Sequence, residues 1–210
     1  PMTFAATINS IILAGGKPVL TDIRRDTFNI DEEKIIEKIN KKTKAILVVH
    51  FAGVPCNMNK IIKIAKKYKL KIIEDCAHAI ETKYLNKPVG NFGYAGCYSF
   101  YSNKNITTGE GGMLTCDNKK LFEKVKMMRL HGMSRDAWKR YMPEETPKTI
   151  LYQHYDILYT GLKYNMIDIN AAIGIEQLKK IDQMWNKRKN LYNKYFNELK
   201  KFGIILQGTN

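Results

Sequence analysis

Thr43-Lys44-Ala45-Ile46-Leu47-Val48-Val49-His50 and Lys71-Ile72-Ile73-Glu74-Asp75 are the two stretches that decide the fold. Each is a short apolar, largely β-branched run, too short for a helix of ordinary length and typical of a buried parallel strand. Between them, after Pro55, apolar residues recur at helical spacing while lysines occupy much of the other face. The apolar positions of this predicted helix are Ile61, Ile62, Ile64, Ala65 and Tyr68. Strand, helix and strand in this order favour an α/β fold with a mainly parallel sheet.

The same alternation continues beyond Asp75. Residues 96–100 and 112–116 are predicted strands on either side of a glycine-rich turn, and residues 119–129 are a predicted helix. One long helical pattern then runs from about Met166 to Leu199. Residues 134–160 carry prolines and tyrosines without clear periodicity, so we expect a long excursion over the surface there. The predicted class is α/β, with a mainly parallel sheet between helices.

Composition excludes several classes and leaves one alternative open. The chain has 35 Lys and Arg residues against 20 Asp and Glu residues, a net charge of +15, and 44% of its residues are hydrophobic. This balance excludes a disordered chain, a collagen and a disulfide scaffold. The charge is compatible with a basic nucleic-acid-binding module, but the lysines are scattered over several predicted helices and form no stripe with aromatic residues. No apolar run approaches the roughly 20 residues of a membrane span, so none is expected.

The cysteines and the ends of the chain give two further expectations. Cys56, Cys76, Cys97 and Cys116 include no close pair of the kind a zinc site uses, so we expect small buried thiols in a reduced, cytoplasmic protein. The chain opens at Pro1 on an apolar segment and stops just after an apolar run. We therefore expect a piece of a longer protein, with sequence missing at both ends.

Four polar side chains fall where predicted strands end, which is where ligands gather in a parallel α/β sheet. They are Asp75, His78, Ser99 and Lys104. Taken alone, Asp75 could cap a helix, His78 could be a structural imidazole and Lys104 could be an ordinary loop lysine. Together they match the needs of pyridoxal phosphate. A lysine amine forms a Schiff base with its aldehyde, an aspartate pairs with its pyridine nitrogen, and a hydroxyl helps to hold its phosphate.

Three segments carry a resemblance to a known family. They are Glu74-Asp75-Cys76-Ala77-His78-Ala79, the run from Ser99 to Gly112 (Ser-Phe-Tyr-Ser-Asn-Lys-Asn-Ile-Thr-Thr-Gly-Glu-Gly-Gly), and the run from Lys163 to Ala172. In this order they resemble the DegT/DnrJ/EryC1/StrS family, fold-type-I pyridoxal-phosphate-dependent sugar aminotransferases. The resemblance extends over essentially the whole chain, and within the family it is nearest to the enzymes that make UDP-4-amino-4-deoxy-arabinose.

The resemblance implies roles for particular residues. Lys104 would be the catalytic Schiff-base lysine, Asp75 would pair with the pyridine nitrogen, and His78 would lie near the ring hydroxyl. Ser99 would contact the phosphate, Phe4 would stack on the ring, and Asn165 would reach the phosphate of a partner subunit.

The resemblance also implies an activity and a domain plan. The activity would be transfer of an amino group, with glutamate as the donor, to a keto group of a nucleotide-linked sugar, in a homodimer with shared active sites. Residues 1–182 would belong to the cofactor-binding large domain, and residues 183–210 would form a long helix and the start of a small domain. A family member that has lost catalysis and acts in regulation is a further alternative. Lys104 argues against the family branch that has histidine at this position and dehydrates sugars.

Overall fold

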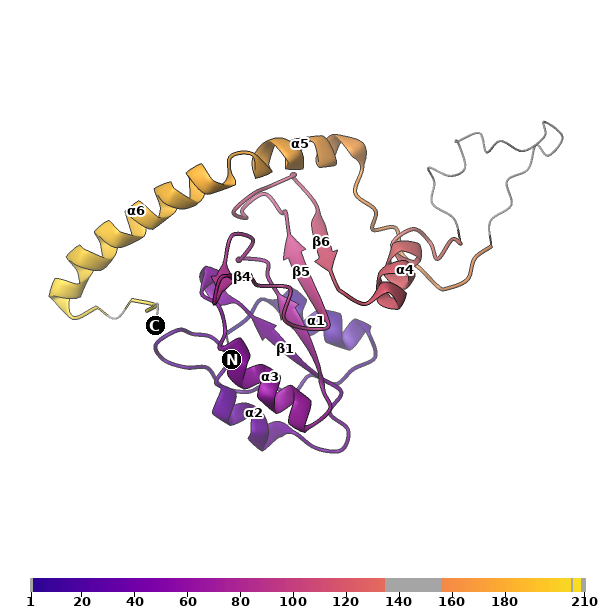
Figure 1. Cartoon of the computed structure of the whole chain (residues 1–210), viewed down its shortest axis with the longest axis horizontal. Helices are drawn as coiled ribbons and strands as arrows, with labels where there is room; N and C mark the ends of the chain where they lie inside the picture. Colours follow the sequence, from indigo (N-terminus) through magenta and orange to yellow (C-terminus); the bar gives the residue numbers. More distant parts are fainter. Residues whose placement is uncertain (1, 135–155, 205, 209–210) are drawn as a thin grey trace. The chain divides into compact units, whose positions relative to one another are not determined.

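The computed structural model of the chain describes residues 2–134, 156–204 and 206–208 (Figure 1). It forms two compact units, one of residues 1–116 with 168–210 and one of residues 117–167. The first unit contains, in chain order, α1 (Ala5–Leu13), α2 (Glu32–Lys38), β1 (Ala45–Val49), η1 (Phe51–Gly53), α3 (Met58–Lys67), β2 (Lys71–Asp75), β3 (Lys83–Tyr84), β4 (Lys87–Pro88), β5 (Ala95–Ser99), β6 (Gly112–Thr115), α5 (Asp168–Leu178), α6 (Ile181–Leu199) and η3 (Lys200–Phe202). The second contains α4 (Lys119–Met128).

The main sheet has the strand order β1-β2-β5-β6. β1, β2 and β5 run parallel, and β6 pairs antiparallel with β5. In the register, Val49 lies opposite Asp75, and Asp75 lies opposite Cys97. The carboxyl ends of the three parallel strands therefore meet at one edge, which confirms the predicted α/β class and its mainly parallel sheet.

The core lies between this sheet and α2 and α3. Side chains alternate across a strand, so Ile46, Val48 and Ile72 face the helices and are buried. Met58 and Ile61 of α3 are fully buried against them, each contributing on the order of 1.5–3 kcal/mol. Asn57 caps the helix, because its side chain accepts the Lys60 N–H, so the start of α3 is fixed by local sequence as well as by packing.

Two sequence expectations meet a different outcome. The single helix expected from Met166 to Leu199 is two helices, α5 and α6, separated at Lys179 and Lys180, where the sequence has no glycine or proline. Of the four thiols expected to be buried, Cys97 is exposed and Cys116 is partly exposed, while Cys56 and Cys76 are buried. Cys97 lies opposite Asp75 in the register, and successive side chains of a strand point to opposite faces of the sheet. Cys97 therefore lies on the face that α2 and α3 do not cover.

Two other expectations stay as they were. Most of the surface excursion predicted for residues 134–160, namely 135–155, lies outside the described residues. The domain boundary at residues 182/183 remains a prediction. In the parts of the chain that the structure describes, no helix is both long enough and apolar enough to span a membrane.

Candidate active site

Asp75 ends β2 at the carboxyl edge of the sheet. Its neighbour Glu74 points into the core, so Asp75 points to the opposite face. Its carboxylate is held on both oxygens: Oδ1 accepts the Ala77 N–H at 3.1 Å, and Oδ2 accepts the Thr7 hydroxyl at 2.7 Å. A carboxylate has about four lone-pair directions, so acceptor capacity remains for a ligand.

His78 follows Asp75 by three residues and is partly buried. Its Nδ1 accepts the N–H of Ala52 at 3.4 Å, and its ring meets Phe51 edge to face at a centroid distance of 6.1 Å. The pKa of His78 is lowered by burial and further by the charge of Lys104, while Asp75 opposes the shift. The charges of the amine and the carboxylate therefore both act on the imidazole, and the Asn105 side chain, next to Lys104, donates to the His78 carbonyl at 3.5 Å.

Lys104 lies in the loop that joins β5 to β6. The loop is closed by hydrogen bonds from the Phe100 N–H to the Gly111 carbonyl (2.8 Å) and from the Thr108 N–H to the Phe100 carbonyl (2.9 Å). Ile106 is buried at 2% exposure and anchors the loop from within. Lys104 itself is partly exposed, and none of the residues described here forms an ion pair with its amine. The loop is thus fixed by its own contacts while the amine is left available.

A second set of contacts supports the residue next to Lys104. The Asn105 side chain donates to Glu81 Oε1 at 2.6 Å, and Arg188 of α6 donates to the Asn105 carbonyl at 2.8 Å. Arg188 also lies 3.7 Å from Glu81 Oε1. Neither Glu81 nor Arg188 could be predicted from the sequence. Arg188 is one of several cationic residues of α6, and no local pattern sets it apart.

The remaining predicted site residues differ in how they are placed. Ser99 ends β5, and its Oγ accepts the Tyr101 N–H at 3.3 Å. Phe4 precedes α1, the helix whose Thr7 reaches Asp75, and its side chain is 76% exposed. Asn165 belongs to the second unit, where its side chain accepts a hydrogen bond from Lys163. Its role at the active site stays a prediction.

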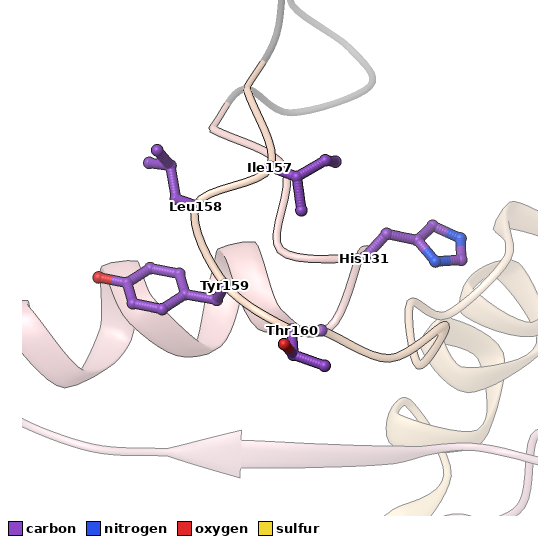
Figure 2. Close-up of a pocket in the computed structure, with 6 residues that line it drawn as sticks. His131, Ile157, Leu158, Tyr159 and Thr160 are labelled. Atoms are coloured by element: carbon purple, nitrogen blue, oxygen red, sulfur yellow. The ribbon is translucent and has the colours of Figure 1, made fainter.

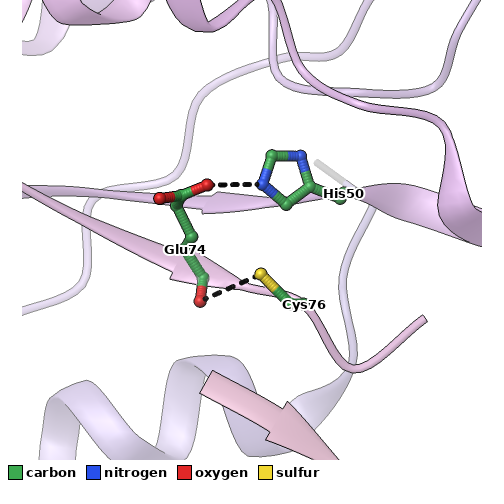
Figure 3. Close-up of side chains that lie close together, drawn as sticks. All are labelled: His50, Glu74 and Cys76. Carbon is green, nitrogen blue, oxygen red and sulfur yellow. Dashed lines mark hydrogen bonds and ion pairs between the residues drawn. The ribbon is translucent and has the colours of Figure 1, made fainter. Parts of the chain in front are cut away.

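A buried group of His50, Glu74 and Cys76 has the composition of a metal site (Figure 3). The Cys56 N–H donates to His50 Nδ1, so His50 Nε2 carries the proton and donates to Glu74 Oε2 at 3.1 Å. The other donors to the Glu74 carboxylate are the N–H groups of Gly90 (2.7 Å), Phe92 (2.8 Å) and Gly93 (2.6 Å). The ring nitrogens and carboxylate oxygens are therefore already engaged, and the group is a structural anchor.

The pKa values in this anchor agree with that role. Burial alone would raise the pKa of Glu74, but the hydrogen bonds from His50 and from three backbone N–H groups outweigh it, so the pKa lies below its usual value. Burial raises the pKa of the Cys76 thiol, which keeps it protonated and unsuited to bind a metal. The anchor ties the loop at Gly90–Gly93 and the end of β1 to the strand that carries Asp75.

The second unit has a shallow hollow lined by His131 and residues 157–161 (Figure 2). The labelled side chains point in different directions, and Ile157 and Leu158 are more than half exposed. No acid, amine and imidazole meet there among the residues that can be described, so the candidate site remains the sheet edge of the first unit.

The residues at that edge fit pyridoxal phosphate by their chemistry. Asp75 is an oriented carboxylate with lone pairs to spare, and His78 is an imidazole whose pKa is lowered. Within the described ranges, no residue engages His78 Nε2 and none forms an ion pair with the Lys104 amine. An α/β sheet with this group at its carboxyl edge defines the large domain of a pyridoxal-phosphate-dependent transferase. More particularly, the chain belongs to the DegT/DnrJ/EryC1/StrS aminotransferase family, whose sequence model matches residues 1–209.

Two relatives are similar to this chain in sequence along nearly its whole length. The uncharacterized protein MJ1066 of Methanocaldococcus jannaschii is 50% identical over 208 residues, which are 98% of this chain and 52% of that protein. The spore coat polysaccharide biosynthesis protein SpsC of Bacillus subtilis is 41% identical over 195 residues, 93% of this chain and 49% of that protein. The chain thus spans about half the length of the curated relatives it matches.

Solved structures agree with this assignment. PseC of Helicobacter pylori, an aminotransferase in pseudoaminic acid biosynthesis, superposes with a TM-score of 0.83 at 33% identity over 94% of this chain and 49% of that one. The putative sugar aminotransferase Spr1654 of Streptococcus pneumoniae has been solved in PLP and PMP forms. The PMP form superposes with a TM-score of 0.84 at 28% identity, over 94% of this chain and 53% of that one. A variant of the dehydratase ColD with bound GDP-perosamine superposes with a TM-score of 0.82 at 27% identity, over 94% of this chain and 52% of that one. Pyridoxal phosphate is accordingly the cofactor of this family.

Proposed function

We propose that the full-length protein is a pyridoxal-phosphate-dependent aminotransferase that transfers an amino group, with glutamate as the donor, to a keto group of a nucleotide-linked sugar. The observation that carries the proposal is that Asp75 ends β2 at the carboxyl edge of the sheet and that the loop of Lys104 reaches His78 there, where the Asn105 side chain donates to the His78 carbonyl at 3.5 Å. The polysaccharide and nucleotide-sugar relatives, SpsC, PseC and ColD, support the substrate class. The 4-keto sugars, as for UDP-4-amino-4-deoxy-arabinose, are the proposed subclass.

Each residue has a proposed task. When bound, pyridoxal phosphate supplies an electron sink that stabilises negative charge on a substrate carbon. Lys104 would hold the cofactor through its amine and would afterwards move a proton at the substrate carbon. Asp75 would pair with the pyridine nitrogen, and His78 would lie near the ring hydroxyl. Ser99 contributes to phosphate binding, and Phe4 covers a face of the ring.

The quaternary arrangement and location belong to the same proposal. We expect a cytoplasmic homodimer in which Asn165 of one subunit contributes to the site of the other. Asn165 carries an amide that can donate to a phosphate oxygen, which is the chemistry this role needs. A mass measurement in solution, with and without cofactor, tests the dimer.

The two alternatives find no support in a specific observation. Many lysines and arginines lie in i,i+3 pairs or over aromatic rings of their own unit, such as Lys179 with Glu176 and Lys71 over Tyr94. The chain retains Asp75, and it retains Lys104 in a loop that is fixed by hydrogen bonds. Both observations argue against a family member that has lost catalysis and acts in regulation. We therefore retain the aminotransferase as the function.

The proposal is tested by two separate half-reactions on the full-length protein. Glutamate alone should convert the PLP form into the PMP form with release of 2-oxoglutarate. A 4-keto nucleotide sugar should then restore the PLP form with one equivalent of amino sugar. Failure of glutamate but success of another amino acid would change the donor only. Failure of every amino donor, with cofactor bound, would refute the activity.

A further inference from the structure

Thr7 is the one residue of α1 that is buried. Its residue exposure is 9%, whereas Ile12 and Leu13 of the same helix are 54% and 86% exposed. A helix normally buries its apolar side chains and leaves hydroxyls in water. In α1 the polar residue is inside, so its position needs a polar partner.

That partner is Asp75, 68 positions along the chain. The Thr7 hydroxyl donates to Asp75 Oδ2 at 2.7 Å, within the usual range for a hydroxyl and a carboxylate. The Ala77 N–H holds the other oxygen, Oδ1, at 3.1 Å. Two donors, one on each oxygen, fix the plane of the carboxylate. With only one donor, the carboxylate could rotate about its last side-chain torsion, which is a broad one.

Thr7 has no other structural task that explains its type. The residue at the start of α1 is Phe4, and no side chain caps the helix. The Thr7 backbone is already engaged, since its N–H donates to the Phe4 carbonyl and its carbonyl accepts the Ser10 hydroxyl. Threonine is a poor helix former, so helix propensity does not favour it here. The hydroxyl contact with Asp75 is the remaining reason.

We propose that Thr7 is a positioning residue: its hydroxyl, together with the Ala77 N–H, holds the Asp75 carboxylate in the orientation that meets the pyridine nitrogen of the cofactor. This inference rests on the proposed function, because it needs Asp75 in that role. It places a second contribution to the site next to Phe4 in the chain: Phe4, directly before α1, would supply the stacking ring, and Thr7 of α1 would support the acid.

The test compares Thr7→Val with Thr7→Ser in the full-length protein. Valine has the shape of threonine without the donor, and serine retains the donor. Pyridoxal phosphate is titrated into cofactor-free protein, and the absorbance of the bound cofactor is followed with pH. We expect Thr7→Val to weaken cofactor binding about tenfold, as for loss of a hydrogen bond to a charged group, and to shift the pH profile. Thr7→Ser should remain near the wild-type values.

The controls separate positioning from stability. Ser10→Ala removes a hydroxyl of the same helix that does not reach Asp75, and should leave affinity and pH profile unchanged. In an Asp75→Ala background, Thr7→Val should weaken binding no further. If Thr7→Val does not fold, as judged by circular dichroism, Thr7→Ala is compared with Thr7→Ser in its place.

Several results would overturn the inference. One is equal cofactor affinity and equal pH profile for the donor-free variant and the wild type. Another is an undiminished effect of Thr7→Val when Asp75 is absent. A third is a loss of thermal stability without any change at the cofactor. Wild-type protein that binds no cofactor would instead refute the proposed function, and this inference with it.

Discussion

The substitution Glu74→Gln tests whether the buried carboxylate anchors the strand that carries Asp75. Glu74 is fully buried and accepts four hydrogen bonds, two on each oxygen. Glutamine keeps the size but replaces one oxygen by an NH2 group, which can only donate. One pair of donors then loses its acceptor: either the Phe92 and Gly93 N–H groups, or the Gly90 N–H and His50 Nε2. His50 cannot relieve the conflict by changing tautomer, since its Nδ1 already accepts the Cys56 N–H.

The magnitude follows from these contacts. A buried donor left without an acceptor costs about 1–3 kcal/mol. Two such donors, in a site with no exposed side chain, give an expected loss of about 3–5 kcal/mol, the range found when a buried charged partner is removed. Such a loss is a large fraction of the roughly 5–15 kcal/mol by which a domain is stable.

The assay is urea unfolding of the cofactor-free, full-length protein at neutral pH, followed by circular dichroism. Glu33→Gln is the matched control, because Glu33 makes one exposed ion pair with Lys60 and should change stability by less than about 0.5 kcal/mol. If Glu74→Gln were as small in effect as Glu33→Gln, the carboxylate would not be an anchor, and the interpretation of the His50, Glu74 and Cys76 group would be wrong.

Three further predictions concern the same unit. The stability difference between wild type and Glu74→Gln should be complete above about pH 5 and should shrink on acidification, because a carboxyl whose pKa is lowered by folding stabilises only while it is ionised. Urea midpoints at several pH values measure this difference, and a difference that grows towards low pH would contradict the prediction. Arg188→Ala should lower the free energy of unfolding by about 1 kcal/mol, because the guanidinium is half exposed but donates a hydrogen bond to the Asn105 carbonyl. It should also raise the rate of proteolysis in the Lys104 loop. Lys201→Ala, which removes an exposed i,i+3 ion pair, should do neither. Gly96→Ala should cost more than about 3 kcal/mol, since the added Cβ would overlap the backbone of Gly90 and neither segment of the sheet edge can move freely; recovery of soluble protein at the wild-type urea midpoint would refute this.

The strands and helix that build the parallel sheet could be predicted from sequence for a clear physical reason. Apolar side chains are buried along one face of β1, of α3 and of β2. The spacing of these residues within a short stretch of sequence therefore predicts the element. α4 could be predicted although none of its residues is buried, because its side chains alternate at helical spacing and Asn118 caps its start. By contrast, the direction of β6 depends on its pairing with β5, which no local pattern encodes.

The features that escaped prediction depend on contacts between distant residues. α1 buries only Thr7, so it has no apolar periodicity to recognise. The division between α5 and α6 has no glycine or proline to mark it. Cys97 has apolar and aromatic neighbours in sequence, yet it faces the uncovered side of the sheet.

The candidate site shows the same contrast. Asp75, His78 and Lys104 could be proposed because they follow strand ends and stand in recognisable motifs. Their supports could not: Thr7 reaches Asp75 over 68 positions, and Arg188 reaches Asn105 over 83. Residues of this kind are found only when the chain is folded, since their neighbours in sequence have unrelated partners.

The central claim, that Lys104 is the residue that attaches pyridoxal phosphate, has one direct measurement. Full-length protein is loaded with the cofactor, reduced with borohydride, digested and analysed by mass spectrometry. The account predicts a single stable cofactor label, on the peptide that contains Lys104, and its loss in Lys104→Ala. A label on a different lysine, or equal labelling of Lys104→Ala, would contradict the account.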